Sequence, residues 1–166
     1  MAGGPLLPSS IYVGGASGNL SVNFYIPATN TNNAGAIEGV SVIASLGADA
    51  PAVLQFNIPP TGGIPTGTLK LRVLAWANAT SGTAKLDIAD GATSPPANIG
   101  ATTLTTEAGS PTISQTWTTA DVIVENKVPL TTAPTAGQIL TVLATFRTAS
   151  WNLAQASVWQ FSLIWE

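Results

Sequence analysis

Residues 69–77 read LKLRVLAWA, and this stretch decides the fold class. Apolar side chains occupy every second position from Leu69 to Ala75, while Lys70, Arg72 and Trp76 fall on the opposite phase. A period of two places the two sets on opposite faces of a β-strand. The stretch therefore predicts a strand with one face turned toward a core.

The same period recurs along most of the chain between turn-forming segments. Twelve Pro and sixteen Gly disfavour long helices, and a helical turn is expected only near residues 151–156. Further strands are expected at 22–26, 39–44, 53–58, 83–88, 101–106, 112–117, 121–130, 138–148 and 157–165. This pattern predicts an all-β fold, an antiparallel β-sandwich with jelly-roll topology.

Residues 78–82, read as a tight turn, predict a hairpin between 69–77 and 83–88. In that hairpin Lys70 or Arg72 would lie across from Asp87. A loop is expected to follow from Asp90 to about Gly100.

The length of 166 residues indicates one domain, which we expect to span 21–166. Residues 1–20 are rich in Gly, Pro and Ser and are expected to form a flexible, extended N-terminal arm. Apolar side chains interrupt this arm, and we expect them to dock on a partner or a second copy of the chain. They are Leu6, Leu7, Ile11, Tyr12 and Val13.

Charge is scarce, with five Lys or Arg, eight Asp or Glu, no His and no Cys. Without His and Cys, Ser-His and Cys-His nucleophile systems are excluded. Five scattered basic residues form no basic patch for nucleic acid, and no apolar run is long enough for a membrane span. A surface with so little charge is a solubility liability in a free monomer, so we expect an assembly to cover much of it.

Carboxylate chemistry is the remaining catalytic option. Asp121 and Glu125 would lie roughly 13 Å apart on one strand face, too far for a glycosidase pair. We expect both, with Asp87 and Asp90, to be solvated surface groups. The segment from Asp87 to Gly91 lacks the acidic spacing of a calcium loop, and Asp90 is expected to cap a turn. No catalytic residue, cofactor, metal site or small-molecule substrate is therefore expected.

The tryptophans have two interpretations, as sugar-stacking platforms or as packing residues. Trp159 and Trp165 share their phase with apolar neighbours and are expected in the core. Trp76 shares a face with Arg72, so both are expected on the outer face of a central strand, near a contact between subunits. Trp117 is left open between the two interpretations.

Two stretches carry a family resemblance: LRVLAWANATSG at 71–82, and the ending with LATF at 143–146, TASWNL at 148–153, SVW at 157–159 and IWE at 164–166. Residues 69–166 resemble small structural proteins of tailed bacteriophages, in particular the β-sandwich decoration (cement) proteins that sit as trimers on icosahedral capsids. The resemblance implies a homotrimer that binds the major capsid protein, bridges its neighbours and stabilises the shell. It also implies a location on the capsid surface of a virion assembled in the host cytoplasm.

Three other functions compete with this one. A carbohydrate- or receptor-binding module of a phage tail or fibre would use the same fold and needs exposed aromatic side chains in a groove. Another structural virion role, as shell subunit or tail component, would differ in stoichiometry and position. A hydrolytic enzyme would need two carboxylates converging in a pocket.

Overall fold

The computed structural model describes residues 5–13, 20–25, 39–44, 49–60, 64–77, 81–95, 102–109, 111–120, 122–148 and 157–166. These residues contain eleven strands and no helix. The strands are β1 (Ser10–Val13), β2 (Leu20–Tyr25), β3 (Gly39–Ala44), β4 (Ala50–Asn57), β5 (Leu69–Ala77), β6 (Gly82–Thr93), β7 (Thr105–Thr106), β8 (Ile113–Trp117), β9 (Val122–Pro129), β10 (Ile139–Arg147) and β11 (Ser157–Trp165).

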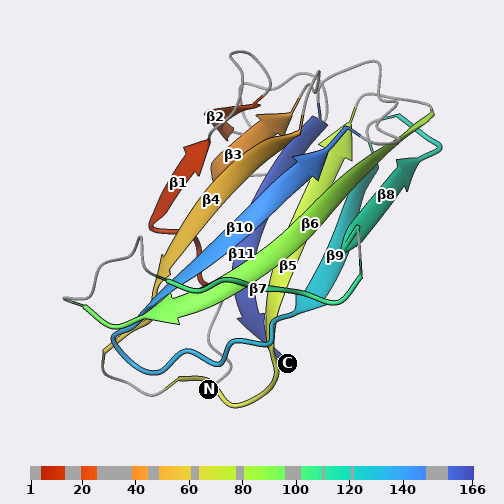
Figure 1. Ribbon diagram of the computed structural model, residues 1–166. Helices are drawn as coiled ribbons and strands as arrows, with labels where there is room; N and C mark the ends of the chain where they lie inside the picture. The colour runs from red at the N-terminus through yellow and green to blue at the C-terminus, as the bar shows by residue number, and fades with distance from the viewer. Residues whose placement is uncertain are drawn as a thin grey trace.

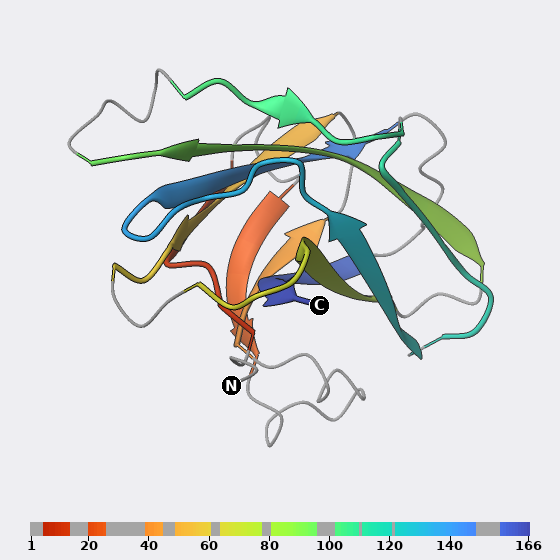
Figure 2. The same ribbon diagram turned by 90° about the horizontal axis from the view of Figure 1, so that it is seen from below.

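The strands form two antiparallel sheets (Figure 1). The five-stranded sheet has the order β2-β3-β11-β5-β9. The six-stranded sheet has the order β1-β4-β10-β6-β7, and β8 also pairs with β6. Figure 2 shows the sheets as two layers, with β6 and β10 in one and β5 and β11 in the other. The all-β sandwich expected from the sequence is confirmed.

The order of the strands is that of a jelly roll. From β3 to β6, and again from β8 to β11, each strand is followed by one in the opposite sheet. Pairing partners are therefore distant in sequence, as β4 is from β10 and β5 from β11. The central order β3-β11-β5-β9 faced by β4-β10-β6-β8 is the double Greek key expected from the sequence.

The core lies between the sheets and follows the period of two. On β5, the apolar set from Leu69 to Ala75 is buried, whereas Lys70 and Arg72 are partly exposed. An aromatic cluster lies at the centre, where the Trp159 ring centroid is 5.8 Å from that of Trp117 and 5.6 Å from that of Phe146, both edge-on. Burial of such side chains is the main stabilising contribution to this fold.

The hairpin expected from residues 69–88 is wrong. β5 pairs with β11 on one side and β9 on the other, while β6 lies in the opposite sheet. Alternation predicts each strand but does not tell a hairpin from a crossing between sheets. Arg72 consequently pairs with Glu125 rather than Asp87, and Asp87 pairs with Arg147.

The loop expected from Asp90 is also corrected, because β6 continues to Thr93. Gly91 explains the difference: a Cβ at this position would lie 2.4 Å from the Thr103 carbonyl oxygen. In the sequence Gly91 suggests a turn, but here it lets a second backbone segment pass close to a continuous strand. The strand expected at 101–106 is limited to β7, and the expected helical turn at 151–156 lies outside the described residues.

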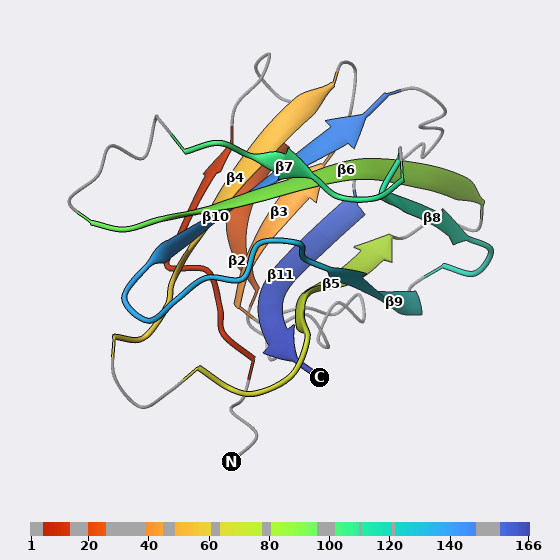
Figure 3. The ribbon, with the colours of Figure 1, turned by 60° about the horizontal axis from the view of Figure 1, so that its bottom comes forward.

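Part of the segment expected to be a flexible arm is paired with the sandwich. β1 extends the six-stranded sheet beside β4, and Leu6 exchanges two backbone hydrogen bonds of 2.8 Å with Leu163 on β11. Figure 3 shows the chain before β1 running beside the end of β11. The physical reason is that Leu6, Ile11 and Val13 pack against the core, which offsets the cost of ordering the backbone.

Candidate functional site

The outer face of the five-stranded sheet is apolar at one end of its strands and charged at the other. The register places Trp76 of β5 between Ile123 of β9 and Val158 of β11. Together with Leu74 these side chains form a small apolar cluster, separate from the core between the sheets. Along the same face of β5, the apolar side chains Trp76 and Leu74 are followed by the charged side chains Arg72 and Lys70.

Ion pairs link the charged end of this face. Lys70 Nζ lies 2.9 Å from Glu166 Oε2, and Lys127 pairs with the other oxygen of the same carboxylate. Arg72 Nε pairs with Glu125. Hydrogen bonds from Lys127 and Lys70 hold the pKa of Glu166 below its usual value, while the hydrogen bond to Glu166 raises the pKa of Lys127. All five groups are partly exposed, so the pairs order these side chains more than they stabilise the fold.

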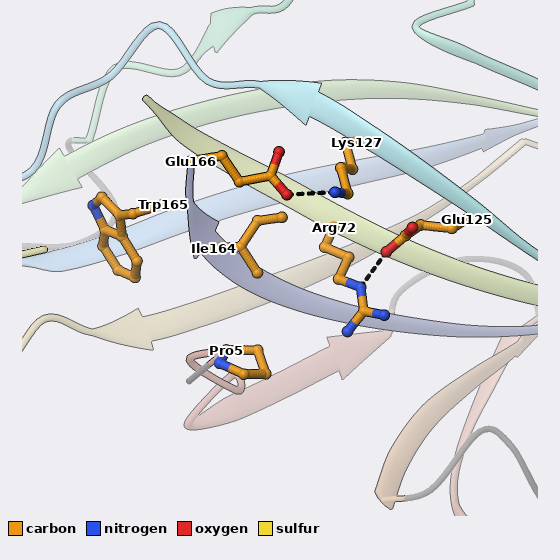
Figure 4. Close-up of a pocket in the computed structure, with 7 residues that line it drawn as sticks. All are labelled: Pro5, Arg72, Glu125, Lys127, Ile164, Trp165 and Glu166. Carbon is orange, nitrogen blue, oxygen red and sulfur yellow. Dashed lines mark hydrogen bonds and ion pairs between the residues drawn. The ribbon is translucent and has the colours of Figure 1, made fainter. Parts of the chain in front are cut away.

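A hollow of about 300 Å³ opens between these side chains and the N-terminal segment (Figure 4). Its lining residues are Pro5, Arg72, Glu125, Lys127, Ile164, Trp165 and Glu166. The bridge between Leu6 and Leu163 brings Pro5 to the hollow, beside the end of β11. The hollow thus combines carboxylates, cations and apolar side chains from three strands and both ends of the described chain.

Arg72 lines the hollow with part of its hydrogen-bonding capacity unused by the described residues. Its Nε is committed to Glu125, while Nη1 and Nη2 bond to no other residue of the described segments. Figure 4 shows these two nitrogens turned away from Glu125 and Lys127, toward the side on which Pro5 lies. Its side chain is 34% exposed, so a ligand can reach the two nitrogens.

The structure places the residues expected at contacts as follows. Arg72 and Trp76 lie on the outer face of β5, as expected, but only Arg72 lines the hollow, and Trp76 is 8% exposed. In the N-terminal segment, Leu7 and Tyr12 point outward, with exposed fractions of 55% and 72%. Leu6, Ile11 and Val13 are turned toward the core instead.

The described tryptophans differ in their burial and in their position relative to the hollow. Trp117 and Trp159 are buried in the core, so Trp117 is no sugar-stacking platform. Trp165 is partly buried against the core and also lines the hollow, so it is not a pure core residue. Trp151 lies outside the described residues.

Two of the acidic residues expected to be solvated are placed differently. Asp90 is fully buried on β6, and Asp87 is mostly buried beside Arg147. Burial raises the pKa of Asp90 to about 7, helped by a hydrogen bond with Glu107, which is also buried. Asp90 also accepts a hydrogen bond from the Thr132 amide instead of capping its own turn. Asp121 lies outside the described residues.

Within the described segments, no group of three or more acidic, His or Cys side chains could hold a metal ion. The search for long apolar helices, restricted to the same residues, finds no candidate for crossing a membrane.

Comparison with known proteins finds solved structures of similar fold but no related sequence. No family model matches the sequence, and no curated protein matches it. TmCBM61, solved in complex with β-1,4-galactotriose, is 13% identical, with 95% of this chain and 90% of that chain covered and a TM-score of 0.48. The CBM22-1 xylan-binding domain from Paenibacillus barcinonensis is 12% identical, with 99% and 96% covered and a TM-score of 0.46.

A third likeness is to the enzymatically active domain of tailspike protein 4 from Bacteriophage CBA120. It is 10% identical, with a TM-score of 0.47, and the match covers 95% of this chain but 19% of that chain. The structural neighbours are thus β-sandwich carbohydrate-binding modules and a phage tailspike domain, and no capsid decoration protein is among these three. At these identities and TM-scores the likenesses carry no argument for function.

Of the residues that line the hollow, the sequence predicts a contact role for Arg72 alone. In the sequence Glu125 has only Asp121 as a possible catalytic partner, and Trp165 is expected in the core. Pro5, Lys127 and Glu166 carry no local signal, because they reach Arg72 through pairings between strands that are far apart in the sequence.

Proposed function

We propose that the protein is a non-catalytic carbohydrate- or receptor-binding module, of the kind that a phage tail or fibre carries, and that its ligand occupies the hollow beside Arg72. The observation that supports this is the gathering of charged and apolar side chains in one hollow on an otherwise nearly uncharged chain. Ligand sites combine apolar lining with a few convergent polar groups.

A sugar ring matches this mixture of groups. Its hydroxyls both donate and accept hydrogen bonds, and the hollow offers donors on Arg72 and Lys127 and acceptors on Glu125 and Glu166. The C–H faces of the ring would lie against apolar side chains such as Ile164. Because the ion pairs already order the charged side chains, little of their conformational entropy is lost on binding.

The charge state of Glu166 supports binding without hydrolysis. A glycosidase needs one carboxyl group that stays protonated near neutral pH to act as the acid. In the hollow, hydrogen bonds from two lysines lower the pKa of Glu166. The carboxyl group whose pKa is raised to about 7, Asp90, is fully buried away from any ligand.

A glycan array with the full chain tests the proposal, followed by calorimetry on the best ligand. Ile164→Asn should weaken binding about tenfold, because an apolar contact worth roughly 1.5 kcal/mol is lost. Val122→Asn is the matched control, since Val122 is exposed on β9 of the same sheet and outside the hollow. Absence of any bound glycan, or equal effects of both variants, would contradict the proposal.

A second candidate is the capsid decoration protein, a homotrimer on the major capsid protein at the virion surface. It is supported by the low charge of the chain and by two exposed apolar side chains, Tyr12 on the edge strand β1 and Leu7 before that strand. Aromatic side chains such as Tyr12 are enriched at protein interfaces.

The test for this candidate is the mass of the protein in solution by light scattering, together with binding to undecorated capsids. The double variant L7S/Y12S should keep the fold, because both side chains are exposed, and should lose the trimer or capsid binding. A monomer that does not bind capsids, or a double variant that binds them normally, would dismiss this candidate.

A further inference from the structure

The distribution of charge indicates the chemical class of the ligand. Three of the five basic residues of the chain, Lys70, Arg72 and Lys127, lie at the charged end of the outer face with the two acidic residues Glu125 and Glu166, and all of these except Lys70 line the hollow. These side chains carry a net charge of +1, on a chain whose net charge is −3. The charged end of the outer face is therefore suited to an anionic ligand.

The donors and acceptors of the hollow are not equally available. Both oxygens of Glu166 accept hydrogen bonds from lysines, and Glu125 accepts one from Arg72. Within the described segments the terminal nitrogens of Arg72 bond to no other residue, and they are turned away from Glu125 and Lys127 (Figure 4). A ligand thus meets unused donors in a fixed fork, beside acceptors that are already partly occupied.

A guanidinium with two adjacent free N–H groups has a preferred partner. Its planar fork matches the two oxygens of a carboxylate and forms a bidentate pair, which is stronger and more directional than a bond to a neutral hydroxyl. Glu125 holds the guanidinium plane through Nε and so fixes the direction in which the fork points.

We propose that the hollow binds acidic sugars, and that the terminal nitrogens of Arg72 receive the sugar carboxylate. This inference rests on the proposed carbohydrate-binding function and narrows it to uronate- or sialate-containing glycans. Ile164 and Pro5 would contact the ring, and Lys127 would add to the positive field around the carboxylate.

The experiment is a glycan panel of four groups, neutral, uronate-containing, sialylated and sulfated, probed with the full chain at two salt concentrations. Carboxylate-bearing glycans should be the binders, and their affinity should fall as salt rises, because screening weakens charge pairing at an exposed site. Binding restricted to neutral glycans would overturn the inference and leave the proposed function standing. Binding restricted to sulfated glycans would overturn the assignment of the carboxylate, and binding of none would overturn both proposals.

Variants of Arg72 then test the assigned residue. Arg72→Gln should weaken binding of the best acidic glycan about tenfold to a hundredfold. Arg72→Lys should restore only part of the loss, because a lysine keeps the charge but lacks the fork. Arg147→Gln is the matched control, since Arg147 pairs with Asp49 and Asp87 on the other sheet. Full affinity in Arg72→Gln, or full rescue by Arg72→Lys, would overturn the bidentate contact.

Discussion

Asp90 and Glu107 are two acidic side chains that the fold buries together. Glu107 Oε1 accepts hydrogen bonds from the amide and hydroxyl of Thr131, at 2.7 and 3.0 Å, and Asp90 Oδ2 accepts one from the Thr132 amide, at 3.2 Å. Asp90 Oδ1 is buried and has no hydrogen-bond partner among the described residues, and the Glu107 carboxyl group contributes to raising the pKa of Asp90. Burial and the neighbouring Glu107 carboxyl group both favour the protonated form of Asp90, which raises the pKa of Asp90.

We predict that the free energy of unfolding falls as pH rises from about 4 to about 7. The folded pKa of Asp90 is about 7 and the ordinary value is 3.8, so in this interval the folded state holds the extra proton. The slope should approach about 1.4 kcal/mol per pH unit and vanish above the folded pKa. Asp90→Asn should remove this slope, as measured by urea unfolding at pH 5, 6, 7 and 8.

Asp49 supplies the control for that measurement. Hydrogen bonds from Thr148 and Arg147 lower the pKa of Asp49 to about 2, so its contribution is lost only in acid, as pH falls from about 4 toward 2. Asp49→Asn should therefore leave the slope between pH 5 and 7 intact. If Asp90→Asn also leaves this slope intact, the slope does not come from a proton held by Asp90.

At the scale of the element, β6 has three pairing partners, more than any other described strand. It pairs with β10 along its length and with β7 and β8 on its other edge. Gly91 allows the segment around Thr103 to lie against it, and this approach leads the chain to Glu107, whose amide donates to the Ile88 carbonyl. The glycine and the acidic pair therefore belong to one local arrangement.

Gly91→Ala should lower the free energy of unfolding by about 1–3 kcal/mol or more, because the added Cβ overlaps the Thr103 carbonyl oxygen and backbone must shift. Thermal and urea unfolding measure the loss. Ala89→Gly, two residues earlier on β6, is the control and should cost only about 0.5–1 kcal/mol through backbone entropy. A loss no larger than that of the control would show that the 102–104 segment moves aside freely.

At the scale of the whole molecule, residues 5–13 connect the sheets and complete the hollow. Leu6 pairs with Leu163 of β11 in one sheet, and β1 pairs with β4 in the other. Pro5, the residue before Leu6, lines the hollow. Stability and the candidate site therefore both depend on this segment, which the sequence suggested would be an arm.

Deletion of residues 1–13 should lower the free energy of unfolding by about 2–5 kcal/mol, because the apolar side chains of Leu6, Ile11 and Val13 leave the core. It should also weaken ligand binding at the hollow. Urea unfolding and calorimetry measure the two effects, with the exposed-residue variant L7S/Y12S as the control of unchanged stability. An unchanged stability after the deletion would restore the view of this segment as an independent arm.

Most strands could be predicted from the sequence, because alternation is local and survives in the fold. The ranges 39–44, 69–77 and 157–165 agree with β3, β5 and β11. The wrong predictions arise where one residue type is compatible with two structures. A glycine such as Gly91 can mark a turn that ends a strand, or it can let a neighbouring backbone lie close to a strand that continues. The prediction of a hairpin at 78–82 is wrong, because turn-forming residues are compatible with both a hairpin and a crossing between sheets.

By itself the sequence determined the all-β class, the apolar faces of the strands and the scarcity of reactive side chains, since each follows from residue type and period. Only the tertiary structure decided which strands are neighbours, and with that the ion pairs of Arg72 and Glu166, the burial of Asp90 and the hollow itself. The physical reason is that these groups lie far apart in the chain. Their contacts arise from burying two whole sheets against each other, and no local pattern encodes that pairing.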